Sequence, residues 1–295
     1  MPLPSSGTLT MAQINAEFGR GNNLNSYRGT QWYTAAGGSG TFPTGAISFS
    51  DFYGKQLASP AFSFTISSNV DQANLRTLAV NAGWNGTAPV VATLAAGYWI
   101  YSSSAGVAAL TIDGSFPGGV TFINNQYVVG MGGNGGNGAP AITAGAGGGT
   151  ALAVSTAVTI YNYSYIAGGG GGGGGGANAV GAYLASFAGG GGGGGGGTGL
   201  GTSLGGAGGA GTAVGAAGSN NYANSSGAAG GAGGVYTTYL GGAGGAGGGW
   251  GSPGATGGTS STANTGAAGG AAGNATSGNG FITWAVTGNR LGPLG

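Results

Sequence analysis

The chain lacks both cysteine and histidine, and only 3% of its 295 residues are charged. Without cysteine there is no disulfide, no thiol nucleophile and no thiolate metal site. Without histidine, no serine has a histidine base to activate it. The four carboxylates, Glu17, Asp51, Asp71 and Asp113, are scattered along the chain and are expected to cap helices or to face solvent. The sequence therefore predicts a protein that is not an enzyme and that holds no metal or cofactor.

Positive charge is equally sparse, with five basic residues and no cluster among them. Binding to nucleic acid needs several basic side chains on one face, so we expect no nucleic-acid partner. No apolar run reaches the roughly 18–20 residues that span a bilayer. The first residues also lack the basic and apolar regions of a signal peptide. We expect a soluble protein, made in a cytoplasm and not inserted into a membrane.

Glycine dominates what the chain does contain. It supplies 79 residues, and its frequency rises sharply near residue 131. Two uninterrupted runs of nine glycines, at 168–176 and 189–197, lie within the stretch 114–289, which has no charged residue. Shorter glycine-rich runs surround them, at 132–138, 145–149, 205–211, 227–234, 241–251, 254–258 and 266–273. The region thus alternates glycine-rich segments with short loops.

These runs are compatible with a flexible tether or with an ordered bundle. Glycine-rich linkers are usually random coils, but they are solvated by serine and charge, whereas this region interleaves tyrosine, leucine, valine and tryptophan. The ordered alternative is a bundle of polyglycine-II helices, which have three residues per turn and direct every N–H and C=O to a neighbour. A collagen triple helix is excluded because glycine does not recur strictly at every third residue. We expect the ordered bundle.

Before residue 131 the chain predicts conventional elements. Thr10 and Gln13 form a capping-box pattern for a helix from 11 to 18, which places Ile14 and Phe18 on one face and ends at Gly19. Ser50 is expected to cap a second, shorter turn. Residues 1–57 hold so few apolar side chains that this module is expected to pack against a partner.

Residues 58–130 predict a β-rich unit, with the form of a short stack of rungs. A helix is expected at 74–82, capped by Asp71 or Asn74 and ended by Gly83. Branched and aromatic residues between glycine, proline and asparagine turns predict strands at 61–67, 90–94, 98–102, 109–112 and 120–123.

An internal repeat connects this unit to the glycine region. Residues 120–133 and 158–171 are identical at seven of 14 aligned positions, at a spacing of 38. Each copy reads as a strand, a turn centred on asparagine, a second apolar strand and then glycines. Self-similarity at a fixed spacing indicates stacked units that bury a face only against each other. The glycine runs are therefore expected to grow out of folded rungs.

The loops between the glycine runs are the candidate binding surface. They are rich in tyrosine, serine, asparagine and threonine, a composition that suits recognition because tyrosine offers a large contact at low entropic cost. Packing over the ends of the bundle is an equal alternative for any one of these aromatics. The candidate residues are Tyr183, Phe187, Tyr222, Tyr236, Tyr239 and Trp250. If successive runs alternate in direction, loops 177–188 and 212–226 share one end of the bundle and 235–240 lies at the other.

Two parts of the sequence resemble structural proteins of tailed bacteriophages. The opening, P-L-P-S-S-G-T-L-T-M-A-Q-I-N-A-E-F-G followed later by A-I-S-F-S-D-F-Y-G-K, is similar to an amino-terminal module of phage virion proteins. The patterns N-A-G-W-N-G-T and F-P-G-G-V-T-F-I-N-N-Q-Y-V-V-G-M-G-G-N-G-G resemble the glycine-rich part of phage tail fibres. The nine-glycine runs with intervening loops resemble distal tail-fibre adhesins that carry a polyglycine-II sandwich. No long fibre shaft or coiled coil is visible.

The resemblance implies a receptor-binding protein of the virion tail, assembled in the host cytoplasm. Its partners would be other tail proteins and a host surface receptor, either a saccharide or an outer-membrane protein, and association with copies of itself stays open. Ile14, Phe18, Phe52 and Tyr53 are the candidate anchoring residues. The alternatives are a purely structural virion spacer and, more distantly, an ice-binding protein.

The expected fold is mainly β with a polyglycine-II helix bundle. It divides into a small mixed module at 1–57 that anchors the chain to the virion, and a unit of β-rungs at 58–130. A glycine-helix sandwich with presenting loops follows at 131–280, and a carboxyl-terminal strand or tail at 281–295.

Overall fold

A computed structural model describes residues 2–138, 141–180, 186–200, 202–203, 214–222 and 225–295; of these, the side chains of 186, 187, 202, 203 and 222 lie outside the description. The chain forms two compact units. The first comprises residues 1–63, 80–91 and 116–120, and the second comprises 64–79, 92–115 and 121–295. Among the described helices, none has the length and apolar character needed to cross a membrane.

The amino-terminal part of the first unit is a small mixed module. Its helix α1 spans Met11–Phe18, with the predicted capping box between Thr10 and Gln13 and with Gly19 in the left-handed region at φ 67°. The other elements are short: the 3₁₀ helices η1 (Leu24–Tyr27) and η2 (Phe49–Phe52), and the strands β1 (Gln31–Thr34), β2 (Ser39–Thr41) and β3 (Lys55–Gln56), which pair antiparallel in the order β2-β1-β3. The second cap differs from the prediction. Ser48, not Ser50, starts η2, because its backbone N–H and hydroxyl both reach the Asp51 carboxylate.

This module closes a core of its own. Six side chains bury against one another: Leu3, Ile14, Phe18, Tyr27, Phe42 and Phe52. The rings meet mostly edge to face, as in the pair Phe18–Phe42 at 5.2 Å between centroids. Burial raises the pKa of the Tyr27 hydroxyl, which donates to the Gly21 carbonyl. The few apolar residues of 1–57 are therefore concentrated in one aromatic cluster.

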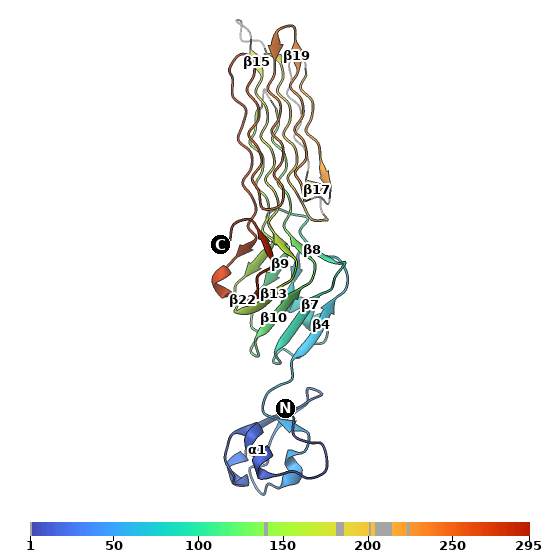
Figure 1. The fold of residues 1–295 in the computed structure, drawn as a ribbon, viewed down its shortest axis with the longest axis vertical. Helices are drawn as coiled ribbons and strands as arrows, with labels where there is room; N and C mark the ends of the chain where they lie inside the picture. Colours follow the sequence, from blue (N-terminus) through green and yellow to red (C-terminus); the bar gives the residue numbers. More distant parts are fainter. Residues whose placement is uncertain (1, 139–140, 181–185, 201, 204–213, 223–224) are drawn as a thin grey trace. The chain divides into compact units, whose positions relative to one another are not determined.

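Three further sheets of short strands form a parallel stack (Figure 1). The first, in the order β22-β13-β10-β7-β4, contains β4 (Phe62–Ile66), β7 (Val90–Leu94), β10 (Val120–Asn124), β13 (Val158–Asn162) and β22 (Ile282–Val286). The second, in the order β23-β14-β11-β8-β5, contains β5 (Val70–Asp71), β8 (Trp99–Tyr101), β11 (Tyr127–Val129), β14 (Tyr165–Ala167) and β23 (Asn289–Leu291). The third, in the order β21-β12-β9-β6, contains β6 (Ala73–Asn74), β9 (Leu110–Ile112), β12 (Leu152–Val154) and β21 (Thr276–Ser277).

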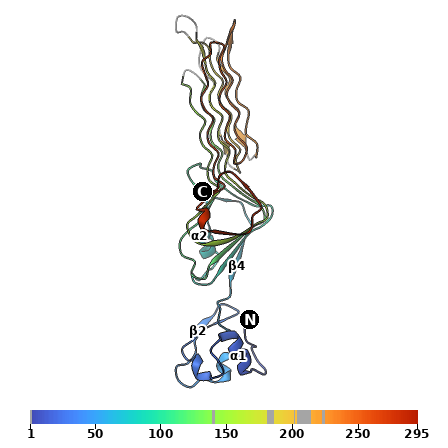
Figure 2. The ribbon, with the colours of Figure 1, turned by 60° about the vertical axis from the view of Figure 1, so that its left-hand side comes forward.

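The chain visits these three sheets in rotation, so that each circuit makes one rung of a parallel stack. Figure 2 shows the rungs wound around a common interior. In the central strands of the stack, such as β9, β10 and β13, alternate residues point inward and are fully buried, among them Phe122, Ile160 and Leu110. Helix α2 (Leu75–Asn81) follows the first rung, and Asn74 accepts a hydrogen bond from the backbone N–H of Thr77 at its start.

The internal repeat is the direct stacking of two rungs. Thr121 pairs with Thr159 and Asn124 with Asn162 in the first sheet, and Tyr127 pairs with Tyr165 in the second, all parallel. Each of these pairs has the predicted spacing of 38. The fully buried Asn124 side chain donates to that of Asn162 at 2.8 Å, so the turn residue of one copy holds the turn of the next.

The glycine-rich segments are insertions at one corner of this stack. Between the second and third sheets, the first rung turns through Gln72 alone and the second through 102–109. The next two rungs insert 130–151 and then 168–275 at the same corner. The rungs therefore continue beyond residue 130, on either side of the glycine insertions. The expected division of the chain into functional modules at 57, 130 and 280 stays a prediction.

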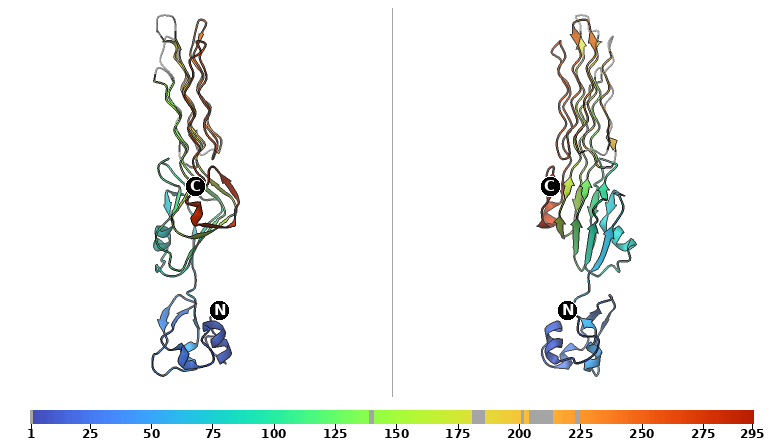
Figure 3. Two further views of the ribbon diagram at one scale, coloured as in Figure 1. Left: turned by 90° about the vertical axis from the view of Figure 1, so that its left-hand side faces the viewer. Right: turned by 45° about the vertical axis from the view of Figure 1, so that its right-hand side comes forward.

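Within the insertions, the segments lie side by side (Figure 3) and bond to one another with a period of three residues. In the run 168–176, successive N–H groups donate in rotation to three different segments. Gly169, Gly172 and Gly175, for example, all donate to 143–149, at 2.9–3.1 Å. The carbonyls of the same run accept in rotation from three other segments, at 130–138, 241–251 and 265–275. Six neighbours thus surround this run.

The hydrogen bonding explains where glycine is uninterrupted. The runs 168–176 and 189–197 are buried along their whole length. A Cβ placed on Gly172 would lie 1.9 Å from the carbonyl oxygen of Asn134, which leaves no room for any side chain. The segments at the outside of the group each have one side that faces solvent. Side chains occur on that side at every third position: Asn134 and Asn137, Ala229 and Ala232, Ala243 and Ala246, Ala268 and Ala271.

Candidate functional site

The first candidate site is a set of loops at one end of the glycine segments. We define the outer loop cluster as residues 178–180, 186–188, 214, 235–240 and 260–264. It contains two short hairpins, β15 (Ala179–Val180) with β16 (Ser186–Ala188) and β19 (Val235–Tyr236) with β20 (Tyr239–Leu240). Figure 1 shows β15 and β19 together at the end of the glycine segments that is away from the three sheets.

Hydrogen bonds connect the loops of this cluster. The backbone N–H of Val180 donates to the Thr262 hydroxyl at 3.1 Å, and the Asn264 amide donates to the Asn178 carbonyl at 3.1 Å. Leu240 and Ser261 exchange two bonds, each 2.9 Å long. Loops that are far apart in the sequence therefore form one surface.

This surface exposes apolar side chains. Val214 is 69% exposed, Val235 64%, Leu240 48% and Tyr236 38%. Val214 belongs here because the adjacent Gly215 packs against the carbonyls of 189 and 190, at the same end. No residue of the outer loop cluster is charged.

The direction of the segments differs from simple alternation. The run 189–197 and the segment 215–219 are parallel, because Gly192 donates to Ala216 and Gly195 donates to Ser219. Residues 178–180 and 186–188 therefore share an end with 235–240, and 221–222 and 225–226 lie at the opposite end. The two segments run in the same direction, whereas simple alternation would make them antiparallel; the connection between them includes 204–213, outside the described residues.

The six candidate binding aromatics accordingly separate. Tyr236 and Tyr239 pair across their hairpin in the outer loop cluster, and Phe187 lies in β16 of the same cluster, although its side chain is outside the description. Tyr183 falls outside the described residues. The remaining two lie at the opposite end. Tyr222 is in β18 (Asn221–Tyr222), which pairs with β17 (Thr202–Ser203), and its side chain is likewise outside the description; Trp250 donates through its indole N–H to the Thr198 carbonyl at 3.0 Å.

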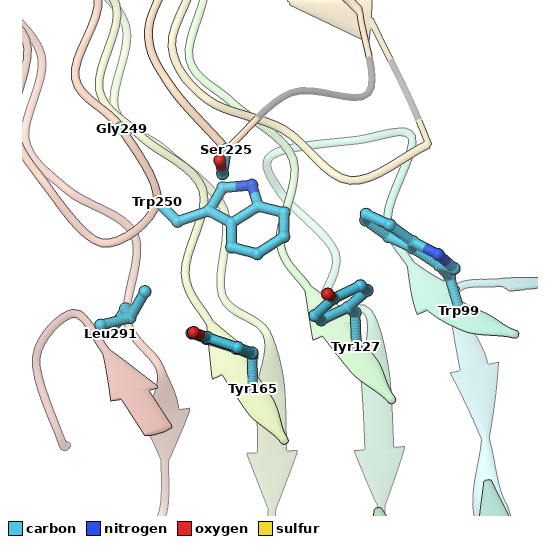
Figure 4. A pocket seen from close by; sticks show the side chains of 7 residues that line it. All are labelled: Trp99, Tyr127, Tyr165, Ser225, Gly249, Trp250 and Leu291. Carbon is cyan, nitrogen blue, oxygen red and sulfur yellow. The ribbon is translucent and has the colours of Figure 1, made fainter. Parts of the chain in front are cut away.

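The second candidate site is an aromatic pocket at this opposite end, beside the second sheet (Figure 4). It encloses about 540 Å³ and is lined by Trp99, Tyr127, Tyr165, Ser225, Gly249, Trp250 and Leu291. The Trp250 ring lies 5.6 Å from Tyr127 and 5.9 Å from Trp99, between ring centroids. The sequence interpretation missed Trp99, Tyr127 and Tyr165 as site residues. The equivalence of Tyr127 and Tyr165 in the 38-residue repeat was the available signal.

The four predicted anchoring residues lie in the amino-terminal module. Ile14, Phe18 and Phe52 are buried in its core, so their side chains shape the module from within. The Tyr53 hydroxyl donates to the Gly7 carbonyl at 2.5 Å. The Tyr53 side chain is half-buried, so none of the four side chains is fully exposed.

All four carboxylates accept hydrogen bonds, one from its own turn and three from residues distant in the sequence. Asp51 caps η2, and Glu17 accepts from the backbone N–H of Leu57 at 2.9 Å. Asp71 accepts from the N–H and hydroxyl of Ser103, and Asp113 accepts from the Asn74 amide at 2.7 Å. In the part of the chain that the structure describes, no three acidic, histidine or cysteine side chains gather as a metal site would require.

A comparison with protein families decides the identity. Residues 61–295 match the family model described as phage tail fibre adhesin Gp38. The chain belongs to this family. The phage tail resemblance seen in the sequence is thereby confirmed, and the Gp38-family match places the chain among the components of a virion tail.

The Gp38-family fold has a counterpart among solved structures. The chain is similar to a chain in the crystal structure of the gp37-gp38 adhesin tip complex of the bacteriophage S16 long tail fiber, with a TM-score of 0.54 and 24% sequence identity. The similarity covers 98% of this chain and 99% of that one. At this identity it concerns the fold, which is β-rich in this Gp38-family chain. No curated protein matches the chain.

Proposed function

We propose that this tail fibre adhesin binds a host-cell surface receptor through the outer loop cluster. The observation that carries the proposal is the gathering of exposed apolar side chains on loops from separate parts of the chain: Val214, Val235, Tyr236 and Leu240. Exposed apolar groups that lie together characterise interaction surfaces. Phe187 belongs to the same proposal because it lies in β16, and Tyr183, outside the described residues, is included by its place in the sequence between β15 and β16.

We further propose that the glycine segments are polyglycine-II helices that hold these loops rigidly. Support comes from the period of three in their hydrogen bonds and from the pairing of every N–H of 168–177 with another segment. Rigidity favours binding because loops that are already ordered lose less entropy when the receptor arrives. The segments at 131–280 would thus be the scaffold of the presented loops.

The proposed role of the amino-terminal module is attachment to another tail protein. The similar S16 chain was solved in a complex of gp37 with gp38, and the similarity extends over 98% of this chain. In this proposal Ile14, Phe18 and Phe52 form the core that shapes the attachment surface, and Tyr53 fixes the chain at Gly7. No catalytic step is proposed.

Competition for adsorption tests the loop assignment. Purified chain should block adsorption of the phage to its host, and the variant Val235→Ser/Leu240→Ser should need about tenfold more protein for the same block, because both side chains would contribute to the contact. The matched control is Ala246→Ser, which alters an exposed alanine on a glycine segment outside the cluster. Its blocking activity should be unchanged.

If the chain is a purely structural spacer, the loop substitutions should not change adsorption. If the loop variant blocked adsorption as well as the unaltered chain, with an equal melting temperature, the outer loop cluster would not be the receptor-binding surface. If neither protein blocked adsorption, although both were folded, the chain would be a spacer.

A further inference from the structure

The aromatic pocket differs from the outer loop cluster because four aromatic rings gather in it. Trp99, Tyr127 and Tyr165 are the first residues of β8, β11 and β14 and pair in register across the second sheet. The residue after each of them is fully buried in the interior of the rungs. Because side chains alternate along a strand, the three aromatic rings lie on the outer face of the sheet. Trp250, from the end of a glycine segment, adds a fourth ring (Figure 4).

The rings are partly exposed, and several of their polar groups have no hydrogen-bond partner among the residues that the structure describes. The hydroxyls of Tyr127 and Tyr165 and the indole N–H of Trp99 make no hydrogen bond within the described part of the chain. The indole N–H of Trp250, by contrast, is bonded to Thr198. Ser225, at the rim, is exposed. The pocket thus combines aromatic faces with free hydroxyl and N–H groups.

Charge is missing from the lining, which consists of aromatic, serine, glycine and leucine residues. An anionic ligand would lose hydration there without a counter-charge. A cation, although aromatic faces attract it, would offer no acceptor to the unbonded Trp99 N–H. A purely apolar ligand would bury the free hydroxyls without partners, at a cost of about 1–3 kcal/mol each. The chemistry that satisfies both requirements is an uncharged molecule with an apolar face and several hydroxyl groups.

We propose that the aromatic pocket binds an uncharged saccharide. The C–H face of a sugar ring carries partial positive charge and fits the negative face of an aromatic ring, while its hydroxyls can pair with Tyr127, Tyr165 and Ser225. The volume of about 540 Å³ is in the range of small-ligand sites. This site is separate from the outer loop cluster and lies at the other end of the glycine segments.

The full chain is tested on an array of uncharged and acidic bacterial oligosaccharides. The affinity of each glycan that binds is then measured by titrating it into the chain and following tryptophan fluorescence. Uncharged glycans should bind, and Trp250→Ala should weaken them at least about tenfold, since a whole stacking face is lost. Tyr127→Phe and Tyr165→Phe keep the rings and should each weaken binding about two- to tenfold, as expected for one hydrogen bond.

The control is Tyr163→Phe, which removes the hydroxyl of a 59% exposed tyrosine that lines neither the pocket nor the outer loop cluster, and it should leave glycan affinity unchanged. Failure of the array to show any uncharged glycan bound above the Trp250→Ala background would overturn the proposal. So would unaltered affinity in both Tyr→Phe variants at unchanged melting temperature. Either result would leave the receptor assignment untouched, because that rests on Val235 and Leu240.

Discussion

The need for glycine depends on position, and two residues in neighbouring segments show this. A Cβ on Gly172 would lie 1.9 Å from the Asn134 carbonyl oxygen, in a run with six bonded neighbours. A Cβ on Gly147 would meet only the Ala271 carbonyl oxygen, at 3.7 Å. Neither glycine has a positive φ. The difference between them is therefore packing and not backbone conformation.

Alanine substitution at these two positions should have opposite effects. Gly172→Ala must push backbone apart and should lower the free energy of unfolding by about 1–3 kcal/mol or more. Gly147→Ala fills open space and restricts the unfolded chain, so it should be neutral or stabilising by up to about 1 kcal/mol. Denaturant unfolding followed by circular dichroism measures both. Equal stability of the two variants would contradict the proposed close packing of the runs.

At the scale of the element, the rungs depend on two buried asparagines. The Asn124 amide donates to Asn162 at 2.8 Å and to the Tyr165 carbonyl at 3.1 Å. The Asn162 amide in turn donates to the carbonyls of Thr287 and Asn289, at 2.9 and 3.2 Å. Three successive turns between the first and second sheets are joined in this way.

Removal of either asparagine amide should leave buried carbonyls without a hydrogen-bond donor. Asn124→Ala and Asn162→Ala are each expected to cost about 1–3 kcal/mol of unfolding free energy. The double variant should cost less than the sum, because the bond between the two side chains is lost only once. Asn125→Ala is the matched control, since that side chain makes no hydrogen bond in the described part of the chain. Strict additivity in chemical denaturation would mean that the two amides do not cooperate.

The elements also show what could be predicted from sequence. The helix at Met11–Phe18 followed from local capping chemistry, and the stacking of β10 on β13 followed from repeated residues. The rungs formed by β7 to β9 and by β22 and β23 share little sequence with that repeat; a stack of rungs was predicted for 58–130, but the register that joins these strands to β10 and β13 was not. At β22 the register shifts between Ile160 and Tyr161, which further obscures any match.

The arrangement of the glycine segments was harder to predict for a physical reason. A segment of glycine and alanine carries no side-chain pattern that distinguishes one chain direction from the other. The parallel course of 189–197 and 215–219 is set by backbone bonds alone. The sequence could therefore predict loops as candidate binding elements, but it could not predict which loops meet. The aromatic pocket was missed for a related reason, because its four aromatic residues lie far apart in the sequence.

At the scale of the whole molecule, the absence of charge has a measurable consequence for adhesion. Residues 114–289 carry no charged side chain, so the outer loop cluster can bind only by apolar and hydrogen-bonding contacts. Salt screens charge–charge attraction over about 8–10 Å at physiological strength and leaves apolar contacts in place. The half-blocking concentration of purified chain should thus change less than about twofold between roughly 20 and 300 mM NaCl. Val214→Lys, at a 69% exposed position, places a cation in the cluster and should create salt dependence on an anionic cell surface. A steep salt dependence of the unaltered chain would show that charged residues outside 114–289 make the contact.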